Sequence, residues 1–322
     1  MNSLLNLVIS IQGWGSSWTG IMRFFSFLGT EEFFLLVLPA LYWNLDASLG
    51  LRVGVILLSS GALNSLLKMF FHMPRPYWVS EKVIPMAGET SFGIPSGHAQ
   101  VSVGVWGMVA AWVRRWWATV AAVLLVFCIG LSRIYLGVHF PQDVVAGWLL
   151  GVLLLAGFLM LERPFLAAFR RLSTGWQLFS IWLFSVALIA LGAFARAQAF
   201  ELPPEWIRLA TRRGLEPPQP WALHGVINPA AALFGLVSGA IWIRNRGGLT
   251  PSGIWWQRVL HYGIGIFGIM LLWMGLGALF PRGETLFAFS LRYLRYALIG
   301  FWVSGLAPYL FQGHFRSPAK PS

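Results

Sequence analysis

Three short segments of the chain hold cations, histidines and a carboxylate at spacings that suit chemistry on a phosphate group. The first segment has Lys68 and, seven residues later, Arg75, which stands between two prolines that would end a helix. An ammonium and a guanidinium group can bind phosphate oxygens through charge-assisted hydrogen bonds. Taken alone, such a pair is more often explained by long side chains that reach out from an apolar surface, so the other two segments decide its interpretation.

The second segment, Pro95-Ser96-Gly97-His98, stands at the start of an apolar run. A Ser-Gly pair at the beginning of a helix presents backbone N–H groups that have no partner within the helix, and the helix dipole adds positive potential there. Such a helix start is a natural seat for a phosphate. A simple helix cap would look similar, but it would not need His98.

The third segment runs from Ser132 to Asp143 and also contains Arg133 and His139. His139 and Asp143 are four residues apart, so they share a face if a helix has already begun at that point. The carboxylate would then hold the imidazole in one tautomer and stabilise its cation. Such an arrangement suits a histidine that acts as a nucleophile or as an acid–base group.

The composition indicates which kind of protein must position these segments. Of the 322 residues, 57% are hydrophobic and 11% are charged, and the mean hydropathy is +0.69. This is far more apolar surface than one soluble core can bury, which excludes a soluble enzyme, a disordered chain, a coiled coil and a secreted disulfide scaffold. The single cysteine, Cys128, allows neither an internal disulfide nor a zinc site built from cysteines. We therefore expect an all-α, polytopic transmembrane helix bundle.

A bilayer span needs about 20 mostly apolar residues, and the sequence predicts about nine such spans. They are expected near residues 24–44, 49–71, 97–113, 116–132, 141–161, 176–195, 226–243, 259–280 and 294–311. The first is the least secure because Glu31 and Glu32 interrupt it. Two connections are long, 72–96 and 196–225. The sequence shows no internal repeat, which argues against a transporter built from inverted halves.

The order of the spans brings the three segments to one side of the membrane. Together they offer three cations, two histidines, a carboxylate and a Ser-Gly helix start. This set suits a tetrahedral phosphate dianion that one histidine attacks while the other protonates the leaving oxygen. It lacks the acidic cluster that a magnesium or two-metal phosphatase needs, so we expect no metal. A channel or transporter that only binds phosphate is an alternative of another class, but it would not need both histidines and Asp143.

The pattern Lys-x6-Arg-Pro, Pro-Ser-Gly-His and Ser-Arg-x5-His-x3-Asp resembles the signature of the type 2 phosphatidic acid phosphatase family. That superfamily includes lipid phosphatases, undecaprenyl pyrophosphate phosphatases, glucose-6-phosphatase and the vanadium haloperoxidases. The resemblance implies a metal-independent phosphatase that needs no cofactor and is inhibited by vanadate.

The resemblance also implies a role for each residue of the three segments. His139 would be the nucleophile that forms a phosphohistidine, and Asp143 would orient it. His98 would protonate the leaving group and then activate water. The phosphoryl oxygens would be bound by Lys68, Arg75, Ser96, the Gly97 amide and Arg133.

The number of spans suggests a further likeness. Lipid phosphatases of the family usually have six spans, which form a six-helix phosphatase core. Residues 1–172 are expected to hold the core spans that carry the three segments, and the sixth span follows them. Residues 173–322 contain that sixth span and the extra helices that complete the bundle. The glucose-6-phosphatase catalytic subunit also has nine spans and is similar to this chain at Arg75–Trp78, Ser132–Leu136, Val144–Gly147 and Pro204–Trp206. It differs at Asp143, where that enzyme has Gln and lipid phosphatases have Asp.

A lipid phosphomonoester or pyrophosphate is the leading expectation for the substrate, because an apolar bundle lets a lipid tail enter between spans. A soluble sugar phosphate, as for glucose-6-phosphatase, is the alternative. The expected partners are this substrate and the membrane lipids, without nucleic acid, and the sequence leaves the oligomeric state open. The long 196–225 connection is expected to be mostly solvated, with the alternative that it leans over the site and selects the head group.

The basic residues predict an orientation. The net charge of +12 could indicate a nucleic-acid partner, but in a membrane protein loop Lys and Arg residues that fix the orientation explain it better. Arginines cluster near span ends on the side opposite to the three segments, at positions 114, 115, 170, 171, 244 and 246. The positive-inside rule makes that side cytoplasmic. The site should therefore open to the extracytoplasmic side of a bacterial inner (plasma) membrane, or to the lumen if the membrane is that of the endoplasmic reticulum.

Overall fold

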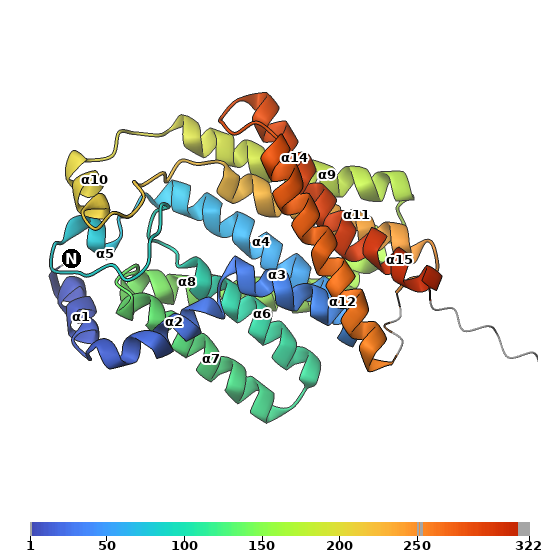
Figure 1. The fold of residues 1–322 in the computed structure, drawn as a ribbon, viewed down its shortest axis with the longest axis horizontal. Coiled ribbons are helices and arrows are strands. Elements are labelled where there is room, and N and C mark those ends of the chain that lie inside the picture. Colours follow the sequence, from blue (N-terminus) through green and yellow to red (C-terminus); the bar gives the residue numbers. More distant parts are fainter. Residues whose placement is uncertain (1, 250, 252–253, 315–322) are drawn as a thin grey trace, which may run out of the picture. The chain divides into compact units, whose positions relative to one another are not determined.

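The computed structural model describes residues 2–249, 251 and 254–314, and within these ranges every regular element is a helix (Figure 1). The first part of the chain forms α1 (Asn2–Gln12), α2 (Thr19–Phe27), α3 (Glu31–Ala40), α4 (Ala47–Phe71), α5 (Pro76–Val79), α6 (Gly97–Val113) and α7 (Trp116–Tyr135). The second part forms α8 (Pro141–Phe169), α9 (Thr174–Ala197), α10 (Pro204–Thr211), α11 (His224–Arg244), α12 (Trp255–Met270), α13 (Leu276–Leu279), α14 (Leu286–Phe301) and α15 (Ala307–His314). The all-α prediction is confirmed.

The described chain has seven helical segments long and apolar enough to cross a membrane, or up to eight if one bent pair counts as a span. The predicted total of nine is therefore not confirmed. The helix predicted at 97–113 is present as α6, but its 17 residues are fewer than the seven longer segments have. The first predicted span is divided between α2 and α3, which bend by 50°. The side chain of Thr30 accepts a hydrogen bond from the Phe33 N–H at 3.3 Å, so it caps a new helix at this point.

The helices group into two compact units. The first unit comprises residues 1–34, 60–162 and 188–226, and the second comprises 35–59, 163–187 and 227–322. All three sequence segments that hold the cations and histidines fall in the first unit. The second unit contains α11, α12, α14 and α15.

Close approach of α8 to α6 organises the first unit. A Cβ atom built on Gly147 would lie 2.5 Å from the backbone oxygen of Ser96, and one on Gly151 would lie 2.7 Å from that of Gln100. Only glycine permits this distance between two helix backbones. The first three turns of α8 thus lie directly beside the start of α6, and both helix starts carry residues of the candidate site.

Polar side chains tie α4 to the same end of α6. Asn64 donates hydrogen bonds to the side-chain oxygen of Gln100 at 2.8 Å and to the backbone oxygen of Pro95 at 3.2 Å. Gln100 in turn donates to the backbone oxygen of Ser60 at 3.3 Å. Because all of these groups are buried, each bond is costly to lose. The network fixes α4 and α6 where their functional residues stand.

In the second unit, buried aromatic side chains bond to a widened helical turn. Trp43 donates to the backbone oxygen of Val303 at 2.7 Å, and Tyr42 donates to that of Ser304 at 3.1 Å. Both acceptors lie in the π-helical turn Trp302–Leu306, and such turns leave backbone carbonyls open to other donors. The aromatic pair and this turn belong to the apolar core of the unit.

Candidate active site

The residues of the three segments stand at neighbouring helix ends. Lys68 lies in the last turn of α4, Arg133 in the last turn of α7 and Asp143 in the first turn of α8. Arg75 and Ser96 immediately precede α5 and α6. All five side chains are buried, and so is that of His139. Six polar or charged residues from the three segments thus share the interior of one unit.

His139 and Asp143 are paired, although not on a common helix face. Nδ1 of His139 lies 3.3 Å from Oδ2 of Asp143, and the Phe140 N–H donates to the same oxygen at 2.9 Å. Helix α8 begins only at Pro141, because proline is well suited to a first helical position. The premise that the helix already includes His139 is therefore wrong, and the contact arises because the Asp143 side chain folds back over the helix start. A carboxylate next to Nδ1 favours the tautomer with its proton on Nδ1, so that Nε2 is the unprotonated nitrogen.

The unprotonated Nε2 of His139 lies beside the guanidinium group of Arg75. Nη1 of Arg75 lies 3.2 Å from Nε2 of His139 and donates to the backbone oxygen of Val138 at 2.9 Å. The same guanidinium donates to the backbone oxygens of Ser91 at 2.6 Å and Phe92 at 3.1 Å. These bonds hold the planar group rigidly beside the imidazole.

Burial lowers the pKa of His139 well below its usual value, and the nearby charges of Arg75, Lys68 and Arg133 act in the same direction. The imidazole is therefore neutral near pH 7, with a lone pair on Nε2. A neutral, oriented imidazole beside cations can attack an electrophile that carries negative charge.

A carboxylate that the sequence analysis missed stands among the cations. One oxygen of Glu89 accepts a short hydrogen bond from Nη2 of Arg133, and the other lies 3.4 Å from Nη2 of Arg75. Burial alone would raise the pKa of Glu89, but the charges of Arg75, Arg133 and Lys68 outweigh it and hold that pKa far below its usual range. Glu89 therefore stays ionised and bridges the two guanidinium groups.

Ser91, two residues further along, also went unpredicted. Its hydroxyl accepts hydrogen bonds from Nζ of Lys68 at 3.0 Å and from Nη2 of Arg75 at 3.0 Å. Both residues belong to the irregular connection 80–96, which carries no periodic pattern. The one signal in the sequence was the imbalance of three cations against a single carboxylate, which calls for a counter-ion.

The start of α6 presents polar atoms without partners. The Ser96 N–H donates to the backbone oxygen of Asp143 at 2.9 Å, while its hydroxyl caps no helix N–H. Among the described residues, the Ser96 hydroxyl, Nε2 of His98 and Nε of Arg133 are buried and have no hydrogen-bond partner. Buried polar atoms are normally bonded to protein, water or ligand, so these three are available to a bound group. The Gly97 amide stands in the first turn of the same helix, where N–H groups have no helical acceptor.

Aromatic rings form a wall next to this cluster. The ring of His72 contacts those of Phe92, Phe200 and Trp221, with centroid separations of 5.6, 5.4 and 4.9 Å. Phe200 and Trp221 come from the long 196–225 connection. Helix α10 of that connection packs on α5, and there the ring centroids of Trp206 and Trp78 lie 6.3 Å apart. The connection therefore lies over the segment that carries Arg75, which agrees with the alternative that it covers the site.

No group of three or more His, Cys, Asp or Glu side chains within the described ranges could hold a metal ion. The positive charge of the site comes from its three buried cations.

Comparisons with known proteins agree with this geometry. Residues 49–167 match the family model described as the PAP2 superfamily, and residues 227–315 match the model "PAP2 superfamily phosphatase, transmembrane extension". Glucose-6-phosphatase 3 of Bos taurus is 30% identical over 335 residues, which cover 92% of this chain and 90% of that protein.

Two further relatives match a smaller share of the chain. Sphingosine-1-phosphate phosphatase 1 of Rattus norvegicus is 30% identical over 137 residues, 41% of this chain. Phosphatidylglycerophosphatase B of Bacillus subtilis (strain 168) is 32% identical over 115 residues, 33% of this chain. The chain spans only 32% of the length of the first of these and 54% of the second.

The match along nearly the whole of a relative, together with the apolar helices and the matched transmembrane extension, makes this an integral membrane protein. The chain belongs to the PAP2 superfamily of phosphatases, and it carries the transmembrane extension of that superfamily.

Proposed function

We propose that the protein hydrolyses a phosphate ester or pyrophosphate through a covalent bond between phosphorus and Nε2 of His139. The observation that carries this proposal is the arrangement around the imidazole: Asp143 on Nδ1 at 3.3 Å and Arg75 beside Nε2 at 3.2 Å. The carboxylate orients the ring, and the guanidinium attracts the phosphoryl group to the nucleophilic nitrogen.

The reaction has two displacements. In the first, Nε2 of His139 attacks phosphorus and the bond from phosphorus to the ester oxygen breaks. His98, which takes up a proton when the negatively charged phosphate binds beside it, gives that proton to the ester oxygen. In the second, water attacks the phosphohistidine, its proton passes to His98, and the P–N bond breaks to release phosphate. In this scheme Asp143 contacts no atom of the substrate, so it is a positioning residue. Its charge stabilises the positive imidazole that forms in the first step.

Five groups bind the phosphoryl oxygens in this proposal. Three are the side chains of Lys68, Arg75 and Arg133, and the other two are the Ser96 hydroxyl and the Gly97 amide. The unpartnered atoms of Ser96 and Arg133 support this assignment. No metal or cofactor takes part, because the buried cations supply the charge stabilisation that a metal would otherwise give.

A phosphorylated lipid is the substrate that we propose first. Phe70, Phe71 and Met73 lie between Lys68 and Arg75 in the chain, and their side chains are exposed. Apolar side chains exposed in a membrane protein contact lipid, so an acyl or prenyl chain can lie beside the cations that bind its phosphate.

A sugar phosphate is the second candidate. The match to glucose-6-phosphatase 3 extends over 92% of this chain, whereas the matches to the two lipid phosphatase relatives cover 41% and 33% of it. In this case the 196–225 connection, which lies over α5, would contact the sugar.

The regions on either side of residue 172 have different roles in the proposal. Residues 1–172 contain every group placed in the reaction and form the phosphatase core, while residues 173–322 complete the bundle. The site faces the extracytoplasmic side because the clustered arginines, among them Arg114 and Arg115, lie at the opposite span ends.

The test is phosphate release by purified protein in detergent from four substrates: phosphatidic acid, phosphatidylglycerol phosphate, undecaprenyl pyrophosphate and glucose-6-phosphate. We expect the highest kcat/KM with one of the lipids. A higher kcat/KM for glucose-6-phosphate would select the second candidate. The matched variants are His139→Ala and, as a control, His72→Asn, because asparagine tolerates the positive φ of 53° at position 72. Equal turnover by wild type and His139→Ala would refute the covalent mechanism.

A further inference from the structure

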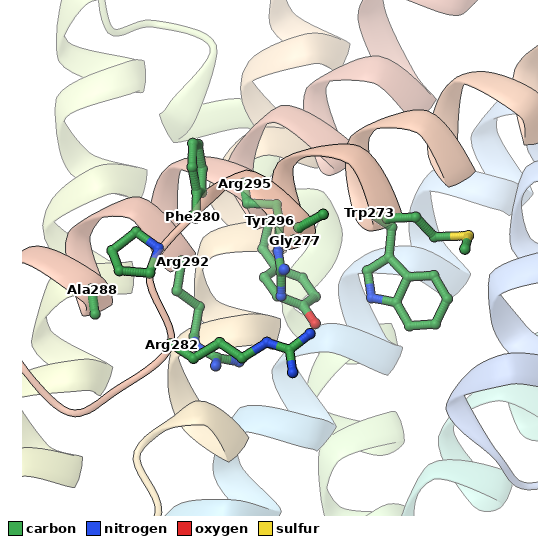
Figure 2. Close-up of a pocket in the computed structure, with 11 residues that line it drawn as sticks. Trp273, Gly277, Phe280, Arg282, Ala288, Arg292, Arg295 and Tyr296 are labelled. Atoms are coloured by element: carbon green, nitrogen blue, oxygen red, sulfur yellow. The ribbon is translucent and has the colours of Figure 1, made fainter.

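The second unit contains a cavity of about 540 Å³ lined by three arginines (Figure 2). It lies between α14 and the segment that includes α13, and its volume is in the range of small-ligand sites, roughly 300–1,000 Å³. Figure 2 shows the side chains of Arg282, Arg292 and Arg295 around Tyr296, with Trp273 on the other side of that residue.

Helix α14 places two of these cations on one face. The side chain of Thr285 accepts a hydrogen bond from the Ala288 N–H at 3.2 Å and so caps the helix at Leu286. Arg292 and Arg295 are three residues apart, which puts them on the same face. The guanidinium carbon of Arg295 stands 5.0 Å from the centre of the Tyr296 ring.

Glycine on the opposite wall makes room for Arg295. A Cβ atom built on Gly277 would lie 2.5 Å from Nη1 of Arg295. Any side chain at this position would push the guanidinium away from where it stands. Nε of Arg295 is buried and has no hydrogen-bond partner among the described residues.

These cations need an anion that the described part of the chain does not supply. None of Arg282, Arg292 and Arg295 forms an ion pair with a carboxylate there. Arg292 and Arg295 lie within the segment Leu286–Phe311, one of the seven long enough to span a membrane. Cations at such depth are costly unless an opposite charge accompanies them. In the orientation proposed above, the connection between α13 and α14 and the start of α14 face the extracytoplasmic side. The positive-inside rule therefore does not explain the arginines of this region.

The surface next to the cavity is strongly apolar. Leu279, Leu286 and Phe287 are 79%, 83% and 67% exposed. They stand in the two helices whose residues line the cavity, α13 and α14. A soluble anion would gain nothing from these side chains, whereas an acyl chain would cover them.

We propose that this cavity binds the phosphate head group of an anionic phospholipid. Guanidinium groups recognise phosphate oxygens through paired hydrogen bonds, and basic pockets between membrane helices bind anionic lipid head groups in this way. The cavity lining contains no counterpart of the two histidines and the aspartate of the histidine site, so we expect it to hold the lipid without cleaving it. The site is separate in kind from the histidine site and does not depend on its proposed reaction.

The test compares phosphatidylglycerol and phosphatidylcholine with identical acyl chains, bound to the delipidated full-length protein and counted by native mass spectrometry. Both lipids are phosphodiesters, and only phosphatidylglycerol carries net negative charge. The pocket variant combines Arg282→Gln, Arg292→Gln and Arg295→Gln. The control removes three exposed arginines of the same unit, Arg163, Arg170 and Arg171, by the same substitution.

We expect wild type to prefer phosphatidylglycerol, and the pocket variant to lose about tenfold or more of that affinity, since a tenfold loss corresponds to about 1.4 kcal/mol. The control should change by much less. Equal binding of both lipids by wild type, or an equal loss in the control, would overturn the proposal. Displacement of the lipid by millimolar inorganic phosphate would assign the cavity to a free anion and overturn the lipid as its ligand.

A second measurement uses wild type alone, so that it does not depend on the folding of the variant. Phosphatidylglycerol with a photoreactive group in its acyl chain should label peptides from residues 271–296 more strongly than the phosphatidylcholine probe does. Equal labelling by both probes in that segment would contradict a charge-selective site.

Discussion

Replacing Glu89 by glutamine tests how the cations of the active site are held before substrate binds. Glu89 bridges Arg75 and Arg133, whose side chains are 0% and 3% exposed, and is itself 25% exposed. Removing one partner of a buried ion pair costs about 3–5 kcal/mol because a charge is left uncompensated. Glutamine keeps one carbonyl acceptor and Glu89 is partly solvated, so we expect a smaller loss, roughly 1–3 kcal/mol. The variant should fold and melt at a lower temperature than wild type.

The same variant should bind inorganic phosphate more tightly. In wild type the Glu89 carboxylate contacts Nη2 of both Arg75 and Arg133, so a bound phosphate would have to share these donors with it. Two unit charges about 5 Å apart repel by about 3 kcal/mol at an effective dielectric of 20. Solvent near the partly exposed carboxylate reduces this, which leaves a gain in phosphate affinity of about tenfold or more.

The assay is the rise in melting temperature with phosphate concentration, followed for wild type, Glu89→Gln and Glu81→Gln. Glu81 is an exposed carboxylate in the same connection and provides the control. Without phosphate, the melting temperature of Glu89→Gln should be lower than that of wild type. It should then rise at phosphate concentrations about tenfold lower than wild type needs, because ligand stabilisation follows the ratio of ligand concentration to Kd. Weaker phosphate binding by Glu89→Gln would refute competition and would mean that Glu89 chiefly orients the arginines.

The pH dependence of stability should separate the two proteins as well. The pKa of Glu89 is depressed in the folded state, so its contribution is complete above the unfolded value of about 4.3 and is lost as the pH falls below it. Wild type should therefore lose its advantage over Glu89→Gln below about pH 4. A difference in melting temperature that stays constant down to pH 3 would contradict the ionised carboxylate.

Five further predictions address the mechanism, the packing of α8 and the topology. His139→Ala should abolish phosphate release while leaving the melting profile near that of wild type, and Asp143→Asn should lower kcat by about 10²- to 10⁴-fold but keep measurable turnover, because it removes the orienting charge and not the nucleophile. Gly147→Val should destabilise the protein by about 1–3 kcal/mol or more, measured by thermal unfolding, since its Cβ would lie 2.5 Å from a backbone oxygen of α6. Phosphate release should survive excess EDTA, and loss of activity that magnesium restores would refute the metal-independent proposal. After replacement of the single native cysteine, a cysteine at Ser80 should react with a membrane-impermeant reagent in intact cells and one at Ser173 should not, whereas the reverse would place the site in the cytoplasm.

The order of apolar runs was enough to predict which side chains meet. The short connections around α7 and the positions of the three segments at span ends left few ways to arrange them. Lys68, Arg75, Arg133, His139 and Asp143 accordingly lie close together in one unit. Gly147 and Gly151 have the spacing typical of a close helix contact, and the structure has such a contact between α8 and α6.

What the sequence left undetermined depends on non-periodic structure. Glu89 and Ser91 lie in a connection without helical pattern, so nothing in their spacing relates them to Arg75 or Arg133. The sequence marked the first predicted span as insecure at Glu31 and Glu32, but it did not show that a new helix would begin there with the Thr30 hydroxyl as its cap. Whether His139 belongs to α8 depends on the residue at which that helix begins, and hydrophobic periodicity does not predict a helix end to within one or two residues.

The position of Glu89 also bears on the choice of substrate. In the resting site the cations of Lys68, Arg75 and Arg133 outnumber the two carboxylates, Glu89 and Asp143, by one charge. A phosphate dianion reverses that sign, and a pyrophosphate, with more negative charge, reverses it further. Since repulsion from a fixed carboxylate grows with the charge of the ligand, removing Glu89 should favour pyrophosphate over monophosphate. We therefore expect Glu89→Gln to lower the Kd for inorganic pyrophosphate by a larger factor than the Kd for phosphate. An equal factor for both anions would mean that Glu89 already moves away from the bound group in wild type, and that the connection 80–96 changes conformation when substrate arrives.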